Sequence, residues 1–458
     1  MTPGYKKEFI IFALVAVAMA AIIWWQRHPK YSWKEDLEYR LDVDFNKTRE
    51  EVTAYIKQYI PEVTDGQIDA WTASGKLEAM ERHGEIRYFK RAARNLFRLD
   101  TAAMRRFEAI EGTPGPLDNH SGVDAVNLPQ IIADVKATGN PIAQPRRMRV
   151  KFTLTVEADA VPAGKTIRCW LPYPRSDVPR QTDIRFIEAG PNGDKGIFSG
   201  NASRHSTLYL EATAVAGQPT VFFEEFEYTA AGEWHDLSKA DIKPYDTTTD
   251  LYKEYTAERE KHIVFTDRIK ALADSLTQGI DNPYEQAKAL FTYIDPAFPW
   301  ASAREYSTLE NIPEYVLSSG HGDCGMVTLL LLTMCRYKGI PCHFQSGFMM
   351  HPGDWNMHDW GELYFEGVGW VPVDMSFGFP PFATGDYLAA NPDTKYFYLG
   401  GIDSYRMVVN SDFGCDLVPR KKVPRSETVD FQRGEVEWEG GNLYYPSWDW
   451  HMDIEYLN

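Results

Sequence analysis

The chain has 458 residues, which at roughly 150 residues per domain suggests about three domains with room for large cores. Hydrophobic residues make up 44% and charged residues 25%, a composition that excludes a disordered chain. The 48 lysines and arginines against 65 aspartates and glutamates give a formal charge of −17, which disfavours nucleic acid as a partner.

The cysteine content excludes a disulfide framework. The five cysteines are odd in number and sparse for the length, so at least one thiol is free. They are Cys169, Cys324, Cys335, Cys342 and Cys415.

Residues 1–30 have the form of a signal anchor or a signal peptide. An uncharged apolar run from Phe9 to Trp25 follows Lys6 and Lys7. Ala18-Met19-Ala20 fits a signal peptidase site, but the apolar run continues beyond it, so we favour an uncleaved membrane anchor. Basic residues flank both ends of the run, and the positive-inside rule barely discriminates. We expect the body on the extracytoplasmic side; the alternative is a secreted or periplasmic protein after cleavage.

Residues 31–112 are predicted to form a helical region, because Thr64 to Gln67 is a capping box followed by an apolar stripe of helical spacing. Its basic residues predict a local basic face on an acidic protein. Such a face contacts anionic lipid or polymer, or it pairs with nearby acids, and we favour pairing. The basic residues are Arg82, Arg87, Lys90, Arg91, Arg94, Arg98, Arg105 and Arg106.

Residues 113–146 read as a linker, because glycines and prolines interrupt both ends of the segment. At Met148 the pattern changes to alternating apolar and polar residues through Val156, which is typical of a half-buried strand. Further short strands separated by turn residues predict an antiparallel β-sandwich over 147–235. They are expected at Thr166–Leu171, Ile184–Ile187, Thr207–Leu210 and Val221–Tyr228.

A new domain is predicted over 236–400, with a helix that starts at Asn282-Pro283. Within it, His321-Gly322-Asp323-Cys324 leads directly into an apolar helix that ends near Tyr337. A helix N-terminus lowers the pKa of a thiol, and the thiolate is the reactive form. Cys324 is therefore expected to be a nucleophile. A strand is predicted at Cys342–Phe348.

The segment after that strand predicts a β-hairpin, with Met357–Phe365 and Trp370–Asp374 joined by a glycine turn. The midpoint of His358 and Asp374 falls at the turn, so the two side chains are expected to meet on neighbouring strands. A carboxylate can then orient the imidazole. Cysteine acyl transfer needs this combination of nucleophile, base and orienting acid.

The motifs G-D-C at a helix start, H-D-W-x-E-L-Y and G-W-V-P-V-D resemble those of the transglutaminase-like superfamily of papain-like cysteine enzymes, over about residues 280–380. The resemblance implies a multidomain α+β protein whose core is a helix packed on an antiparallel sheet. It assigns Cys324 as nucleophile, His358 as base and Asp374 as orienting acid. Such domains occur in protein-crosslinking transferases and in bacterial-type peptidases and amidases that carry an N-terminal β-sandwich.

The oxyanion hole is only partly predicted. The backbone N–H of Cys324 is one donor, and the resemblance implies a second from an upstream polar or indole side chain. Tyr306, Trp300 and Gln345 are the candidates, although aromatic side chains mostly serve packing.

No metal and no cofactor are expected. Six cysteine and histidine residues cluster in sequence, but Cys335 lies eleven residues along the helix from Cys324, about 16 Å away, which is too far to share a zinc ion. The aromatic residues of the C-terminal extension, 401–458, are expected to close the core rather than to bind a glycan. The six are His321, Cys324, Cys335, Cys342, His343 and His351.

The sequence favours a membrane-anchored cysteine enzyme that forms a thioester with a peptide or glutamine-type amide and passes the acyl group to water. A protein-crosslinking transglutaminase uses the same intermediate with an amine. A catalytically silent envelope binding or scaffolding module and a structural anchor with a basic face are the non-enzymatic alternatives. A peptide or protein is the expected substrate partner.

Overall fold

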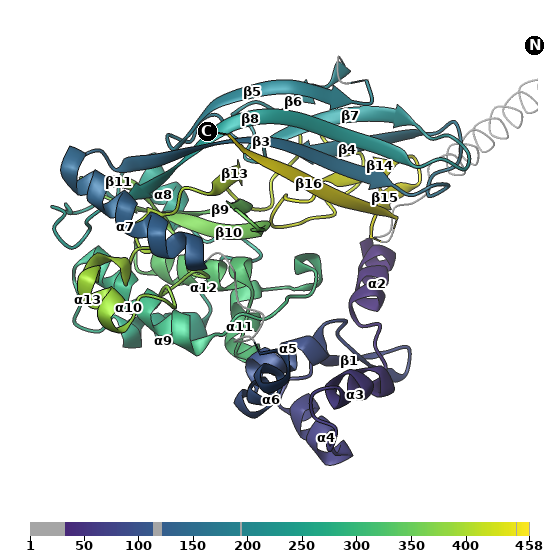
Figure 1. The fold of residues 1–458 in the computed structure, drawn as a ribbon, viewed down its shortest axis with the longest axis horizontal. Helices are drawn as coiled ribbons and strands as arrows, with labels where there is room; N and C mark the ends of the chain where they lie inside the picture. The colour runs from purple at the N-terminus through teal and green to yellow at the C-terminus, as the bar shows by residue number, and fades with distance from the viewer. Residues whose placement is uncertain (1–32, 113–120, 193–194, 446, 458) are drawn as a thin grey trace, which may run out of the picture.

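The computed structural model describes residues 33–112, 121–192, 195–445 and 447–457. A two-sheet sandwich lies above a mixed body of helices and strands, and a small helical region lies below one end of the sandwich (Figure 1). The predicted anchor Phe9–Trp25 lies outside the described residues. Among the helices of the described ranges, none combines the length and apolar character that a membrane crossing requires.

The N-terminal region is helical except for one hairpin. The capping box at Thr64 is present, with its hydroxyl accepting from the N–H of Gln67. The helical prediction was wrong over 79–88, because His83 and Gly84, both with positive φ, form a tight two-residue turn between two strands. The elements are α2 (Trp33–Asp44), α3 (Arg49–Lys57), α4 (Asp65–Ala73), β1 (Ala79–Arg82), β2 (Glu85–Tyr88), α5 (Ala92–Leu99) and α6 (Thr101–Glu111).

Several basic side chains of this region pair with acids. Arg82 lies 2.6 Å from Glu38 and 2.8 Å from Asp42, and Arg106 lies 2.6 Å from Glu62. These contacts occupy part of the predicted basic face within the region itself.

The segment predicted as a linker contains helix α7 (Ser121–Thr138), so that prediction was wrong over most of its length. The helix packs on β3 (Ile142–Val156) and β8 (Thr220–Trp234), and its Leu128 and Ile131 are fully buried. The glycine and proline clusters that suggested a linker lie at the two ends of α7. A Cβ on Gly232 of β8 would collide with the Ile131 side chain, so this glycine allows the close approach.

The predicted antiparallel sandwich is present, and its two five-stranded sheets enclose one apolar core. In one sheet the strand order is β12-β8-β3-β16, with β5 also paired to β8; in the other it is β15-β14-β4-β7-β6. The strands not yet given are β4 (Thr166–Pro172), β5 (Gln181–Gly190), β6 (Ile197–Phe198), β7 (Thr207–Thr213), β12 (Gly401–Ile402), β14 (Glu435–Trp438), β15 (Gly441–Leu443) and β16 (Trp448–Leu457).

The C-terminal extension supplies strands to both sheets of the sandwich. β16 pairs antiparallel with β3 from Trp448 opposite Val156 to Leu457 opposite Arg147, and β14 pairs with β4. Figure 1 shows β16 lying along β3, although the two are some three hundred residues apart in sequence. Trp448 is buried in the sandwich core, as expected for aromatic residues that close a core.

The lower body is a four-stranded antiparallel sheet, order β11-β10-β9-β13, covered by helices. The predicted helix, strand and hairpin are all present as α12, β9, β10 and β11. Its elements are α8 (Asp250–Thr256), α9 (Asp267–Leu276), α10 (Pro283–Ala297), α11 (Ile312–Ser319), α12 (Cys324–Tyr337), β9 (Cys342–His351), β10 (Asp354–Phe365), β11 (Gly369–Val373), α13 (Gly385–Ala390) and β13 (Arg406–Asn410).

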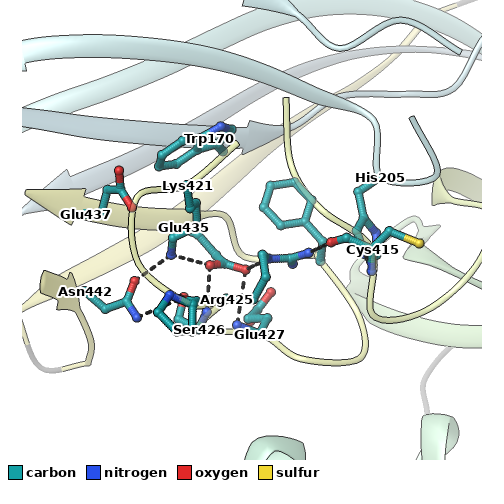
Figure 2. A network of polar contacts seen from close by, with 12 residues as sticks. Trp170, His205, Cys415, Lys421, Arg425, Ser426, Glu427, Glu435, Glu437 and Asn442 are labelled. Atoms are coloured by element: carbon teal, nitrogen blue, oxygen red, sulfur yellow. Dashed lines mark hydrogen bonds and ion pairs between the residues drawn. The ribbon is translucent and has the colours of Figure 1, made fainter. Parts of the chain in front are cut away.

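A loop connects β13 of the lower body to β14 of the sandwich. It is held in place by buried Glu435, the first residue of β14. Its carboxylate binds Lys421 Nζ at 2.5 Å and Arg425 Nε, and it accepts the backbone N–H of Ser426 at 2.8 Å (Figure 2). Burial alone would raise the pKa of Glu435, but Arg425 and Lys421 outweigh it and hold that pKa below its usual range. The fixed loop carries residues 427–433 to the site described next.

Candidate active site

Cys324 is the first residue of α12, and the helix explains its position. Asp323 is the N-cap, and its carboxylate accepts the backbone N–H of Met326 at 3.2 Å. The following residues from Gly325 to Arg336 are all buried, which fixes α12 against β9 and β10. Cys324 itself is partly exposed and lies in the wall of a solvent-open cleft of about 1100 Å³.

The thiol is surrounded by polar groups from three elements. Cys324 Sγ donates to Asp359 Oδ2 of β10 at 3.3 Å, and the Tyr306 hydroxyl donates to Asp323 Oδ1 at 2.5 Å. A Cβ on Gly325 would lie 2.7 Å from Asp359 Oδ2 and would also collide with Tyr306 Oη. The glycine after the cysteine therefore permits the carboxyl group to reach the thiol.

The charge around the thiol reverses one prediction. Burial, followed by the carboxyl groups of Asp359 and Asp323, raises the pKa of Cys324 well above its ordinary value. The expectation that the helix N-terminus lowers this pKa was wrong for this conformation, because desolvation and two nearby acids oppose the helix dipole.

Asp359 is itself perturbed. Burial, then the charges of Asp430 and Asp323, raises the pKa of Asp359. Its other oxygen, Oδ1, accepts from the amide of Gln432 at 2.9 Å. The thiol and the carboxyl group are therefore both shifted toward their protonated forms and joined by one hydrogen bond.

His358 and Asp374 meet as predicted, with Nε2 2.8 Å from Asp374 Oδ2 and both side chains buried. The register differs by two residues from the expected one. Gly361 pairs with Val373. Continued by one residue, this pairing puts Asp374 opposite Trp360, so Asp374 reaches His358 diagonally across the two strands. Asp374 Oδ1 also accepts two backbone N–H groups, from Ser376 at 3.1 Å and Phe377 at 3.0 Å.

Asp374 stays ionised. Burial acts to raise its pKa, but His358, Arg406 and the backbone N–H of Phe377 lower it below the usual range. Arg406 Nη1 lies 2.9 Å from the same Oδ2 that contacts the imidazole.

Two of the predicted residues, His358 and Asp374, are in direct contact, whereas Cys324 forms a hydrogen bond with Asp359, which was not predicted. His358 and Asp359 are consecutive on β10, so their side chains leave opposite faces of the strand. Gln432 holds this point of the strand, because its amide donates to the His358 carbonyl at 2.8 Å as well as to Asp359.

The three oxyanion candidates lie in different places. Tyr306 lies beside the thiol, with its hydroxyl donating to Asp323. Trp300 is partly exposed at the cleft rim, where Arg98 stacks on its ring at 4.2 Å. Gln345 accepts from Trp360 Nε1 at 2.7 Å and lines a separate pocket.

Sequence reasoning missed three residues of the site. Asp359 could have been found from the sequence, because it is an acidic residue next to His358 within the predicted strand Met357–Phe365. Arg406 and Gln432 gave no signal, because each reaches the site from a distant segment.

The sequence cluster weighed for zinc is dispersed in the fold. Cys342 Sγ donates to the Leu332 carbonyl at 3.3 Å, and Cys335 is buried in the helix core. His343 Nε2 lies 2.9 Å from Glu362 on the next strand.

Comparison with known proteins identifies one segment of the chain. Residues 270–375 match the family model of the transglutaminase-like superfamily, so this part of the chain is a transglutaminase-like core. The uncharacterized protein YebA of Bacillus subtilis is 25% identical over 135 residues, which cover 25% of this chain and 18% of that protein. This chain thus matches less than a fifth of its curated relative.

Two solved structures are similar at low identity. A candidate cysteine protease from Cytophaga hutchinsonii is 13% identical, covers 69% of this chain and 92% of its own, and has a TM-score of 0.45. The periplasmic domain of TgpA from Pseudomonas aeruginosa is 15% identical, covers 58% of this chain and 97% of its own, and has a TM-score of 0.26.

Proposed function

We propose that the protein is a cysteine-dependent acyl hydrolase that acts on peptide or glutamine-type amide bonds through a thioester on Cys324. The observation that carries this proposal is the position of Cys324, at the start of a buried helix and in the wall of an open cleft, beside the strand that holds His358 against Asp374. A transglutaminase-like core supports the same class of chemistry.

The proposed acylation step begins from a protonated thiol. Cys324 Sγ attacks the amide carbon, the C–S bond forms and the C–N bond breaks. The thiol proton passes to the carboxylate of Asp359, which accepts the hydrogen bond of the thiol, and imidazolium His358 gives a proton to the leaving amine. Asp374 remains ionised and orients the ring.

In deacylation, water attacks the thioester carbonyl, His358 accepts the proton of the water, and the C–S bond breaks. The product is a carboxylic acid, and the thiol regains its proton. The backbone N–H of Cys324 is the proposed donor to the oxyanion in both steps.

Transamidation to an amine is the second candidate, because the same thioester can pass its acyl group to a primary amine in place of water. The cleft lining combines acidic side chains with the basic Lys90, Arg91, Arg304 and Arg433, so the acceptor is decided by experiment. The non-enzymatic scaffolding module remains the alternative from another class.

The proposed setting follows from the N-terminal sequence. An apolar run after two lysines favours a membrane anchor with the catalytic body on the extracytoplasmic side. The proposed substrate is then a peptide or protein on that side of the membrane.

The test uses a glutamine-containing dipeptide, with ammonia release measured for the full chain with and without a fluorescent primary amine. Hydrolysis predicts equal ammonia release in both conditions. Crosslinking predicts release that depends on the amine, together with its incorporation into casein. A peptide library measured in parallel covers cleavage of ordinary peptide bonds.

Two variants complete this test. Cys324→Ala is expected to abolish every turnover, whereas Cys415→Ala, at another partly exposed thiol, is expected to leave turnover unchanged. Turnover that survives in Cys324→Ala would exclude Cys324 as the nucleophile, and no turnover of any probe by the wild type would favour the scaffold.

A further inference from the structure

A buried chain of alternating charges continues from the His358–Asp374 pair into the protein. Arg406 of β13 lies between two carboxylates, with Nη1 2.9 Å from Asp374 Oδ2 and Nη2 2.7 Å from Asp403 Oδ2. Arg406 Nε also donates a hydrogen bond to Asp403 Oδ2 at 2.7 Å. Arg406, Asp374 and Asp403 are each 0% exposed.

The buried network of charges extends beyond Asp403. His351 Nε2 of β9 lies 3.4 Å from Asp403 Oδ1 and 3.0 Å from Asp124 Oδ1 of α7. Tyr398 donates to the other Asp124 oxygen at 2.8 Å. Asp403 and Asp124 raise the pKa of His351 against the effect of burial.

The network holds more carboxylates than guanidinium groups. Asp124, Asp374 and Asp403 face Arg406, and the buried guanidinium of Arg180 lies near Asp403 and Arg406, so a proton on His351 or His358 offsets the remaining negative charge. Burying charges is tolerated only when they are paired, so a balanced set of this kind is a requirement of the fold as well as a property of the site.

Aromatic rings fix the geometry. The Arg406 guanidinium lies 4.1 Å from the Phe377 ring centroid, and the His358 ring meets the same Phe377 at 4.8 Å and Trp360 at 6.0 Å. The guanidinium and the imidazole are therefore held against one ring on either side of Asp374. Neither can move far without breaking these contacts.

Building on the acyl-transfer function argued above, we propose that Arg406 and Asp403 are positioning residues, which hold Asp374 ionised against His358 and set the pH range over which the imidazole carries its proton. Neither residue contacts the thiol in a hydrogen bond or ion pair among the described contacts. They act through Asp374.

Arg406 and Asp403 have opposite effects on the protonation of His358. The positive Arg406 opposes protonation of His358, and the negative Asp403 offsets Arg406. The charged groups around the imidazole come from four segments: Asp374 after β11, Arg406 of β13, Asp403 before it, and Asp359 beside His358 on β10. His351 and Asp124 act from one step further away.

The experiment is an NMR titration of the full chain carrying ¹³C-labelled histidine, with the His358 signal identified by its loss in His358→Gln. Asp403→Asn is expected to lower the pKa of His358, and Arg406→Gln is expected to raise it, each by about one unit, a tenfold change in the protonation equilibrium. The double variant, which removes one charge of each sign, is expected to return close to the wild type.

Two readouts separate this effect from a general loss of structure. His451, an exposed histidine next to Asp453, is an internal reference whose titration should not change. If Arg406→Gln does not fold, the test rests on Asp403→Asn alone. An unchanged or raised pKa of His358 in that variant overturns the proposal. Shifts of the same sign in both single variants overturn it as well.

A stoichiometric metal ion bound to the purified protein would also overturn the proposal, because Asp124, His351 and Asp403 place ligand atoms within 4.8 Å of one another. The titration needs no substrate. A failure of the peptide and glutamine assays would therefore leave its result intact, and a failure of the titration would leave acyl transfer by Cys324 standing.

Discussion

The carboxyl group beside the nucleophile gives the sharpest quantitative prediction. Asp359→Asn keeps the size of the side chain and the hydrogen-bond partner Gln432 but removes the ionisable carboxyl group 3.3 Å from Cys324 Sγ. We expect this change to lower the pKa of Cys324, because Asp359 is the largest contributor after burial.

The magnitude follows from Coulomb's law. Two unit charges 3.3 Å apart at an effective dielectric constant of about 20 interact with about 5 kcal/mol, and one pKa unit corresponds to about 1.4 kcal/mol. Proton sharing within the pair and water in the open cleft reduce this upper bound. We therefore expect the pKa of Cys324 to fall by at least about one unit, which is about a tenfold gain in thiolate near neutral pH.

The assay is the rate of iodoacetamide alkylation of Cys324 between pH 6 and pH 9, read by mass spectrometry of its peptide. Cys415 is the internal reference, since it is the other partly exposed thiol. Asp453→Asn, an exposed change on β16, is the matched control variant. Identical pH profiles in the wild type and Asp359→Asn would refute the reasoning.

Three further predictions concern stability and are measured by urea unfolding. Glu224 is fully buried with both carboxyl oxygens unpaired, and burial raises its pKa, so its contribution to stability is lost as the pH rises above the ordinary pKa of glutamate. Glu224→Met should therefore raise the free energy of unfolding by about 1–3 kcal/mol at pH 7 and by less at pH 4. A lower free energy of unfolding at pH 7 contradicts this. Glu435→Gln leaves Lys421 and Arg425 without their buried partner and should cost about 3–5 kcal/mol; a cost below 1 kcal/mol would show that the network of Figure 2 is not needed. Gly347→Ala would drive a methyl group into the Met407 carbonyl of the paired strand and should cost about 1–3 kcal/mol, whereas Gly353→Ala, in an open turn with positive φ, should cost about 1 kcal/mol or less; equal costs would count against the close packing of β9 on β13.

Local patterns in the sequence predicted the elements that carry the site. The apolar run after Cys324 indicated α12, and the alternation around His358 with its glycine turn indicated the β10–β11 hairpin. Short-range periodicity and turn chemistry determine such elements, so the meeting of His358 with Asp374 was predictable even though the register is shifted by two residues.

Long-range contacts were not predictable from the same patterns. Helix α7 lies between glycine and proline clusters, which led to the prediction of a linker. β16 pairs with β3, which lies far from it in sequence. The charge around Cys324 was missed for the same reason. The helix dipole is a local effect, whereas Asp359 and the burial of the thiol come from tertiary packing.

The most direct test of the central claim is mass spectrometry of the Cys324 peptide after an acid quench of the full chain during turnover of glutamine-containing peptides. The account predicts an acyl group on Cys324 that hydroxylamine removes and that accumulates when water is partly replaced by a cosolvent. Substrate turnover with no acyl group on Cys324, or with the acyl group on another residue, would contradict it.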